Sequence, residues 1–268
     1  MAPSILGQAT FLLGLKMAFT AAIVVAASVA VERSGPFVGA LIAALPTAAS
    51  AAYVILGFEH PPSFVAASAV GSLAANAAVA IFALVYARLA QRHGVVLSIG
   101  LALMVWFAAA ATLQMVEWSA LGALALNAAV YATTVALSAR YRRAAPIPAL
   151  ARGRSDLLLR ALAAALVVAA VTTASHRIGA FASGVFAVFP IVMSSLAVVL
   201  HPRLGGKASA AVFAHAQPPL FGLAFGFLTV HYLAESLGTW WAYLAGLTVC
   251  AGWSGILWLT RSRPRLRG

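Results

Sequence analysis

Charged residues are scarce in this chain, and their scarcity decides its broad class. Of the 268 residues, 8% are charged and 63% are hydrophobic, and the mean hydropathy is +1.00. A soluble domain of this size keeps about a quarter of its residues charged. Runs of roughly 20 apolar residues, enough for a helix to cross a bilayer, recur along the whole length. The sequence therefore predicts an all-α, polytopic membrane protein with the lipid bilayer as its surroundings.

Cysteine and acidic residues are also nearly missing. The single cysteine, Cys250, lies in an apolar run, which excludes a disulfide framework. No zinc-motif spacing occurs, so the sequence predicts no metal and no cofactor. The five acidic residues all lie at span ends or in loops. Since proton- and cation-coupled carriers commonly bury a carboxylate, this pattern disfavours a carboxylate relay and a strongly cationic substrate.

The apolar runs predict nine membrane spans. They cover about residues 10–31, 36–57, 64–87, 95–114, 118–139, 156–175, 179–200, 209–233 and 239–260. Short polar breaks such as ERSG and QRHG separate most of them, and a longer Pro- and Arg-rich connector covers residues 140–154.

Basic residues gather in alternate loops, which predicts the orientation of the chain. Fourteen of the seventeen lie on one side, among them the five of the 140–154 connector and the four of the tail RSRPRLRG. The other side has only Arg177, together with Glu59, Glu117 and Glu235. The positive-inside rule then places the N-terminus outside and the C-terminus in the cytoplasm. Because the basic residues lie between and after the spans, the net charge of +12 indicates membrane topology and no nucleic-acid partner. The Ala-rich composition favours a bacterial inner membrane.

The chain aligns with itself at a shift of 144 residues. Between residues 33–56 and 177–200 the informative matches are Arg33/Arg177, Gly35/Gly179, Phe37/Phe181, Pro46/Pro190 and Ser50/Ser194. The shift lays spans 1–4 on spans 6–9 and leaves span 5 as a linker. The predicted units are residues 1–115, a linker helix and loop over 116–154, and residues 155–268. Because five spans separate the starts of the two units, they enter the membrane in opposite directions, as in the inverted repeats of secondary transporters.

The matched prolines indicate a binding site near the middle of the membrane. A proline inside a helix removes one N–H donor and frees the carbonyl four residues earlier, here Ile42 for Pro46 and Phe186 for Pro190. Interrupted helices at corresponding positions of two halves are the best sequence indication of a carrier's site. We therefore predict a substrate site at Pro46, Ser50, Pro190 and Ser194. The alternative is a pair of ordinary kinks whose free carbonyls are satisfied by the two serines.

Two cations inside spans, Lys16 and Arg160, are also related by the shift. One lies near each membrane face and could attract an anion from that side. The alternative is that both side chains extend to the headgroups. Further candidates for substrate contact are Asn76, Asn127, His215 and Gln217. Each of these has an alternative role in packing, because buried amides in membrane helices often bond a neighbouring helix.

The sequence thus predicts a carrier or flippase for a small anionic or amphipathic molecule, working by alternating access. Two alternatives remain: a non-transporting membrane component, and a lipid-modifying enzyme using Glu59, His60, His201 and Arg203. The segment GWSG, residues 252–255, resembles the G-x-S-G of rhomboid intramembrane proteases, but no histidine follows Ser254. The chain is accordingly predicted not to be an enzyme. A homodimer is compatible with the sequence.

Overall fold

The computed structural model describes residues 11, 14–22, 25–26, 47–143 and 154–261. These residues form helices and no strands. Seven helices follow a short helical stretch over residues 14–22. They are α3 (Thr47–Glu59), α4 (Pro62–Leu89), α5 (Val95–Leu113), α6 (Ala120–Arg143), α7 (Arg154–Ala187), α8 (Ile191–Leu237) and α9 (Thr239–Arg261). Pro46 and about half of the first two predicted spans lie outside the described residues, so the number nine stays a prediction.

Two glycines divide the longest helices. Gly179 in α7 has φ 79° and ψ 174°, and Gly205 in α8 has φ 79° and ψ 164°. Residues with a Cβ atom rarely adopt such positive φ angles. Each glycine therefore lets the chain reverse direction, so that α7 consists of limbs 154–178 and 180–187, and α8 of limbs 191–204 and 206–237. The predicted seventh span, 179–200, corresponds to the short limb of α7 followed by the first limb of α8.

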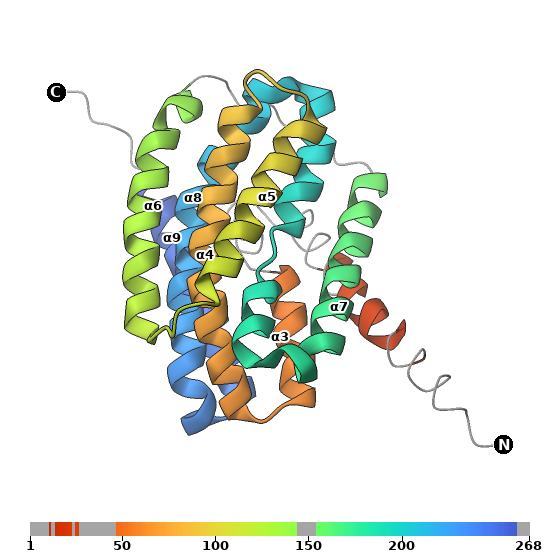
Figure 1. Ribbon diagram of the computed structural model, residues 1–268, viewed down its shortest axis with the longest axis vertical. Helices are drawn as coiled ribbons and strands as arrows, with labels where there is room; N and C mark the ends of the chain where they lie inside the picture. The colour runs from red at the N-terminus through yellow and green to blue at the C-terminus, as the bar shows by residue number, and fades with distance from the viewer. Residues whose placement is uncertain (1–10, 12–13, 23–24, 27–46, 144–153, 262–268) are drawn as a thin grey trace.

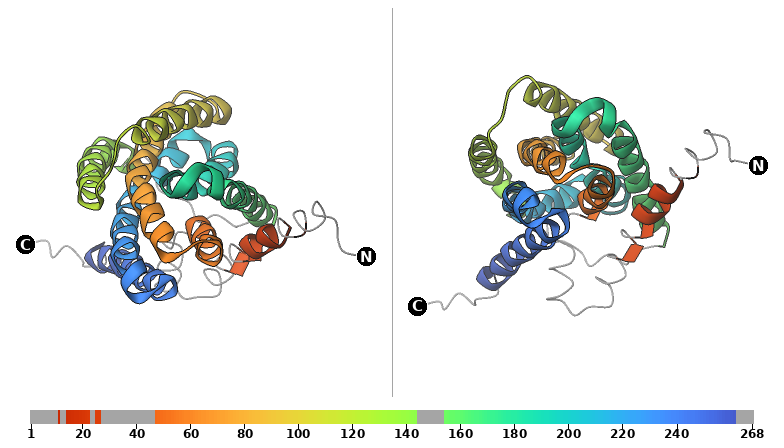
Figure 2. Two further views of the ribbon diagram at one scale, coloured as in Figure 1. Left: turned by 60° about the horizontal axis from the view of Figure 1, so that its bottom comes forward. Right: turned by 90° about the horizontal axis from the view of Figure 1, so that it is seen from below.

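The helices form one bundle in which successive segments run in opposite directions, except that the short limb of α7 and the first limb of α8 continue in the same direction across the gap between them (Figure 1). Among the described helices, α4 and α8 form the most extensive contact. Contacts with α4 or α8 hold α5, α6 and α9 around this pair, and α3 packs on α7, as the turned views also show (Figure 2). α4 is therefore largely buried inside the bundle, with 19 of its 28 residues enclosed.

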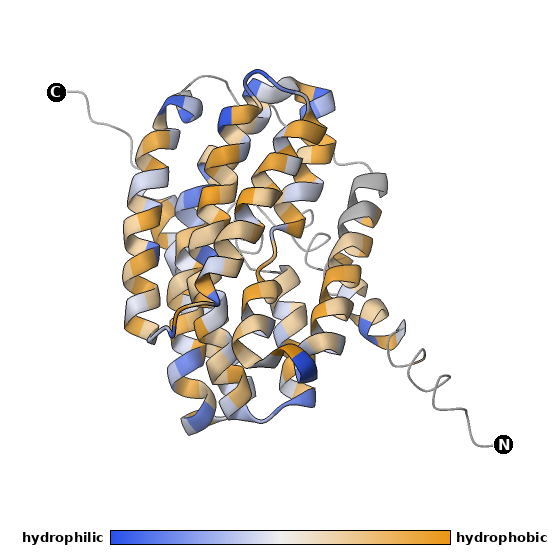
Figure 3. Cartoon of the chain, viewed as in Figure 1, coloured by the Kyte–Doolittle hydropathy of each residue, from blue (hydrophilic) through white to orange (hydrophobic). Residues whose placement is uncertain are grey.

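The hydropathy of the bundle is that of a membrane protein. Five stretches of the described residues are long and apolar enough to cross a bilayer: Pro62–Leu89, Val95–Leu113, Ala120–Arg142, Thr239–Thr260, and Ala161–Leu237, which Gly179, residues 188–190 and Gly205 divide. Figure 3 shows apolar middles and more hydrophilic ends along the same axis. Large apolar side chains such as Val96, Met104 and Leu121 lie on the outer surface. In water these would cost free energy, whereas acyl chains solvate them.

Two glycines bring the short limb of α7 against α4 without intervening side chains. A Cβ atom on Gly71 would overlap the carbonyl of Phe181, and one on Gly184 would overlap the carbonyl of Ser68. Small residues allow this close approach of membrane helices. The contact fixes the short limb, residues 180–187, against the centre of the bundle.

Candidate functional site

The chain is interrupted at Val188–Pro190, inside the bundle and about half-way along its long axis (Figure 1). Pro190 is buried, has φ −75° and ψ 43°, and directly precedes α8. The carbonyl of Phe186, which the proline was predicted to free, accepts a hydrogen bond from the N–H of Phe189 at 3.0 Å. The N–H of Ser194 bonds the carbonyl of Pro190 at 2.9 Å and closes the first turn of α8. The predicted break at Pro190 is thus a true gap between two helical segments.

Aromatic rings from α5 cover this gap. Trp106 lies edge-on to Phe189 with ring centroids 5.0 Å apart, and Phe107 lies 5.7 Å from the same ring. Trp106 also contacts Phe186 at 6.1 Å. Its side chain is fully buried and its indole N–H has no partner. The two rings of α5 therefore pack on the two phenylalanine rings at the gap.

The start of α8 and the first described residues of α3 pack on the same part of α7. Ile191, in the first turn of α8, and Ala48 of α3 both contact the cluster formed by Ala161 and Ala164. Helix N-termini carry unpaired N–H groups and partial positive charge. The start of α8 therefore places such an end inside the bundle, beside α7. Pro46, the other predicted break, lies outside the described residues.

The two predicted serines differ in their surroundings. Ser194 lies in the first turn of α8, is 7% exposed, and its hydroxyl has no hydrogen-bond partner. Ser50 is half-buried and lines a cavity of about 70 Å³ between α3, α8 and α9. The remainder of the lining is mainly apolar and includes Tyr53, Phe227, Tyr243 and Cys250. The cavity would accept an apolar group more readily than a charged one.

A chain of hydrogen bonds connects this cavity with the short limb of α7. The hydroxyl of Tyr243 donates to the carbonyl of Tyr53 at 2.5 Å, and the hydroxyl of Tyr53 donates to Ser72 at 2.8 Å. Ser72 in turn donates to the carbonyl of Gly184 at 2.7 Å. Sequence reasoning missed this chain, because its members lie on four helices and only the fold brings them together.

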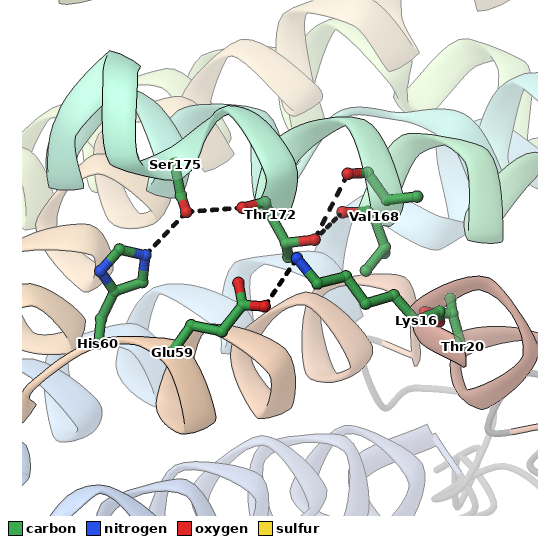
Figure 4. A network of polar contacts seen from close by, with 8 residues as sticks. Lys16, Thr20, Glu59, His60, Val168, Thr172 and Ser175 are labelled. Atoms are coloured by element: carbon green, nitrogen blue, oxygen red, sulfur yellow. Dashed lines mark hydrogen bonds and ion pairs between the residues drawn. The ribbon is translucent and has the colours of Figure 1, made fainter. Parts of the chain in front are cut away.

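The two predicted cations are placed differently by the structure. Lys16 forms an ion pair with Glu59, with Nζ and Oε1 2.7 Å apart (Figure 4). Its charge is therefore compensated in this conformation. Arg160 lies in the second turn of α7, near the opposite end of the bundle, and its side chain is outside the described parts of the chain.

Glu59 and Lys16 belong to a polar cluster at the end of α3. His60 Nε2 lies 2.7 Å from the hydroxyl of Ser175, which is 2.7 Å from the carbonyl of Thr172 (Figure 4). When the hydroxyl of Ser175 donates to Thr172, it accepts from the Nε2–H of His60. Burial lowers the pKa of His60 below its ordinary value and the nearby His176 lowers it further, whereas Glu59 opposes the shift. The neutral imidazole is thus favoured.

The four remaining candidates lie in the helix contacts. Asn76 Nδ2 donates to Asn127 Oδ1 at 3.0 Å, and Asn127 donates to the carbonyl of Ala123 at 2.9 Å. Gln217 Nε2 donates to Ser138 at 2.9 Å, although its Oε1 is buried without a partner. His215 Nδ1 lies 2.8 Å from the carbonyl of Ala211 in its own helix. In this conformation these side chains serve packing, and contact with a substrate stays a prediction for each.

No protein-family model, curated protein or solved structure matches the chain. Its function is therefore argued from its own geometry. That geometry places Pro190 and Ser194 at the gap before α8, Ser50 at the cavity between α3, α8 and α9, and Lys16 beside Glu59 at the end of α3.

Proposed function

We propose that the protein is an integral membrane carrier that moves a small anionic or amphipathic molecule by alternating access. The observation that carries this proposal is the gap at Val188–Pro190, directly before the start of α8 and beside a part of α7 that α3 also contacts. Irregular backbone at membrane depth is tolerated where protein or a water-lined cavity surrounds it. In secondary transporters such interrupted helices supply the substrate site.

Matching helix starts support an inverted duplication of the chain. α4 begins at Pro62 and the long limb of α8 at residue 206; α5 begins at Val95 and α9 at Thr239. Both pairs are displaced by the 144 residues of the sequence repeat. The members of each pair run in opposite directions along the bundle (Figure 1). We propose four-helix units of opposite orientation, joined by α6 as the linker helix.

One contact supports a two-fold axis between the units. Asn76 Nδ2 donates to the carbonyl of Leu220 at 3.3 Å, and these residues are separated by 144 positions. A residue on a two-fold axis contacts its own equivalent. From this point the antiparallel contact of α4 with α8 continues in both directions. In one direction His231 Nδ1 lies 3.0 Å from the carbonyl of Ala66. In the other direction Gly206 lies beside the carbonyl of Ala90.

The proposed cargo site has an anion-binding part and an apolar part. The start of α8 and the unpartnered hydroxyl of Ser194 are suited to an anionic group, because helix N-termini bind anions through N–H groups and the dipole. The cavity beside Ser50 is suited to an apolar body. Since Glu59 compensates Lys16, we assign anion recognition to the start of α8 first and treat guidance by Lys16 and Arg160 as secondary.

A hydrolytic enzyme is the rival to consider, because Ser175 and His60 lie at the distance of a nucleophile and its base. Two observations disfavour it. Ser175 is completely buried and its proton is committed to Thr172. Glu59 does not orient His60, since Oε1 pairs with Lys16 and Oε2 has no partner. The pair is therefore better explained as a link between α7 and the α3–α4 turn.

Transport by the purified protein tests the proposal. Proteoliposomes on a solid-supported membrane would be exposed to a panel of small carboxylates, sulfonates, phosphates and phospholipid headgroups, and transient currents recorded. We expect saturable currents for at least one anion, absent from empty liposomes. Neutral members of the panel would be examined by radiolabelled uptake. A protein that moves no member of the panel in either assay would contradict the carrier and favour a non-transporting component.

A further inference from the structure

We propose that Glu59, His60 and His176 form a binding site for a first-row transition metal ion of the zinc type. The three residues come from the end of α3, the α3–α4 turn and the end of the first limb of α7. One carboxylate oxygen and one ring nitrogen from each histidine all lie within 4.8 Å of one another. Sequence spacing could not reveal this set, because the fold brings His176 from the other half of the chain.

The distances are close to those of a metal site. Zinc bonds to nitrogen and oxygen of about 2.0–2.1 Å place the ligand atoms of a tetrahedral site about 3.4 Å apart. The two imidazole rings already lie with centroids 4.3 Å apart. His176 is exposed, so its side chain can rotate to close the remaining gap, and an ion can enter from solvent.

A second observation indicates a missing partner at Glu59. Lys16 occupies Oε1, whereas Oε2 is buried and has no hydrogen-bond partner. An unpaired buried carboxylate oxygen is costly. A cation on Oε2 would remove that cost without displacing Lys16.

The ring of His60 is held ready for coordination. Its Nε2 lies 2.7 Å from the hydroxyl of Ser175, and the tautomer that donates from Nε2 to Ser175 leaves a lone pair on Nδ1. The ring also stacks on Phe64, with centroids 3.7 Å apart and an interplanar angle of 6°. Such outer hydrogen bonds orient the histidines of metal sites. Two imidazoles and one carboxylate suit zinc, cobalt or nickel, whereas magnesium and calcium prefer oxygen ligands alone.

Metal binding is tested on tag-free protein in detergent. Zn²⁺ would be titrated by competition with a chromophoric chelator, and Co²⁺ by its visible absorption. We expect one ion per chain, with affinity reduced at least tenfold by Glu59→Gln, His60→Ala or His176→Ala. Lys16→Gln is expected to tighten binding several-fold, because it removes a cation beside a ligand.

His93→Ala is the matched control, since His93 is also exposed but lies at the other end of the bundle. It should leave Zn²⁺ affinity unchanged. The metal-free melting temperature of each variant would be compared with wild type, and His176→Ala should retain it because the side chain is exposed. Three results would each overturn the site. They are wild-type protein that binds no stoichiometric Zn²⁺, folded His176→Ala protein with the same Zn²⁺ affinity as wild type, and wild-type protein that binds Mg²⁺ as tightly as Zn²⁺.

A regulatory consequence rests on the proposed carrier. The ion would join the first half of the chain to α7 at the end predicted to face outside, and so oppose opening there. External Zn²⁺ should slow transport by wild type but not by His176→Ala. Zn²⁺ binding with unaltered transport would reject this consequence and leave the metal site intact.

Discussion

Ser194 is the residue on which the proposed site depends most. Its hydroxyl is buried in the first turn of α8 without a hydrogen-bond partner, whereas the hydroxyl of the adjacent Ser195 donates to Val192 at 2.9 Å. A buried polar group without a partner costs about 1–3 kcal/mol. We propose that the Ser194 hydroxyl is kept for the cargo, and the two adjacent serines therefore form a matched pair for experiment.

Ser194→Ala should separate stability from activity. Removing an unsatisfied hydroxyl should leave the melting temperature in lipid nanodiscs unchanged or raise it, while transport falls at least tenfold. Ser195→Ala, which loses a satisfied hydrogen bond, should retain transport. Equal transport by Ser194→Ala and wild type would remove Ser194 from the proposed site.

Asn76 and Asn127 act together in the contact between α4 and α6. Each single change to Ala leaves the other amide buried with fewer partners, so each should destabilise the protein by about 1–3 kcal/mol. The double variant should cost less than the sum, because the shared bond is lost only once. Thr133→Ala, on the exposed face of α6, is the control. If the double variant instead loses as much unfolding free energy as the two single variants together, measured by chemical unfolding, the amides act independently.

At the level of the helices, close backbone contacts determine where the interrupted span lies. The short limb of α7 has eight residues, too few to be a stable helix alone. It is held by Gly71 and Gly184 against α4 and by the hydrogen bond from Ser72. Any residue larger than glycine at these positions should displace the limb.

Gly184→Ala should therefore destabilise the protein by more than about 2 kcal/mol, as expected for overpacking in a closely packed core. Gly100→Ala is the control, because a Cβ atom there meets nothing within 4 Å, and it should be neutral or stabilising. The free energy of unfolding of both variants, measured in mixed micelles, distinguishes the two expected results. A neutral Gly184→Ala would mean that the limb is not held by this contact.

Much of this architecture was predictable from the sequence. The apolar runs predicted long apolar helices, which the described residues from α4 onward contain, because lipid requires such helices; the number and bounds of the spans stay a prediction. Proline chemistry predicted the break at Pro190. The ion pair of Lys16 with Glu59, the Tyr53–Ser72–Gly184 chain and the Glu59–His60–His176 cluster could not be predicted. Each joins residues far apart in the sequence, and no local pattern encodes which helices become neighbours.

At the scale of the whole molecule, the two ends of the bundle carry different charges. His93, beside Arg88 and Arg92, lies at one end, and Met115, beside Glu117, lies at the other. The positive-inside rule assigns the first end to the cytoplasm. Alternating access opens the carrier first to one side of the membrane and then to the other. The orientation decides which end of the bundle faces each side.

Cysteine labelling tests the orientation. In a Cys250→Ala background, Met115→Cys should react with a membrane-impermeant maleimide in intact cells, and His93→Cys should react only after permeabilisation. Both positions are exposed, so their intrinsic reactivity should be similar. The reverse pattern would invert the proposed topology.

The most direct test of alternating access is a pair of distance distributions from electron paramagnetic resonance. In the same background, one sample carries labels at Phe58→Cys and Ile178→Cys, and a second at His93→Cys and Lys207→Cys; all four positions are exposed and each pair joins the two halves. Alternating access predicts two distances at each end, with substrate, pH or lipid shifting the ends in opposite directions. A single narrow distance at both ends under every condition would contradict it.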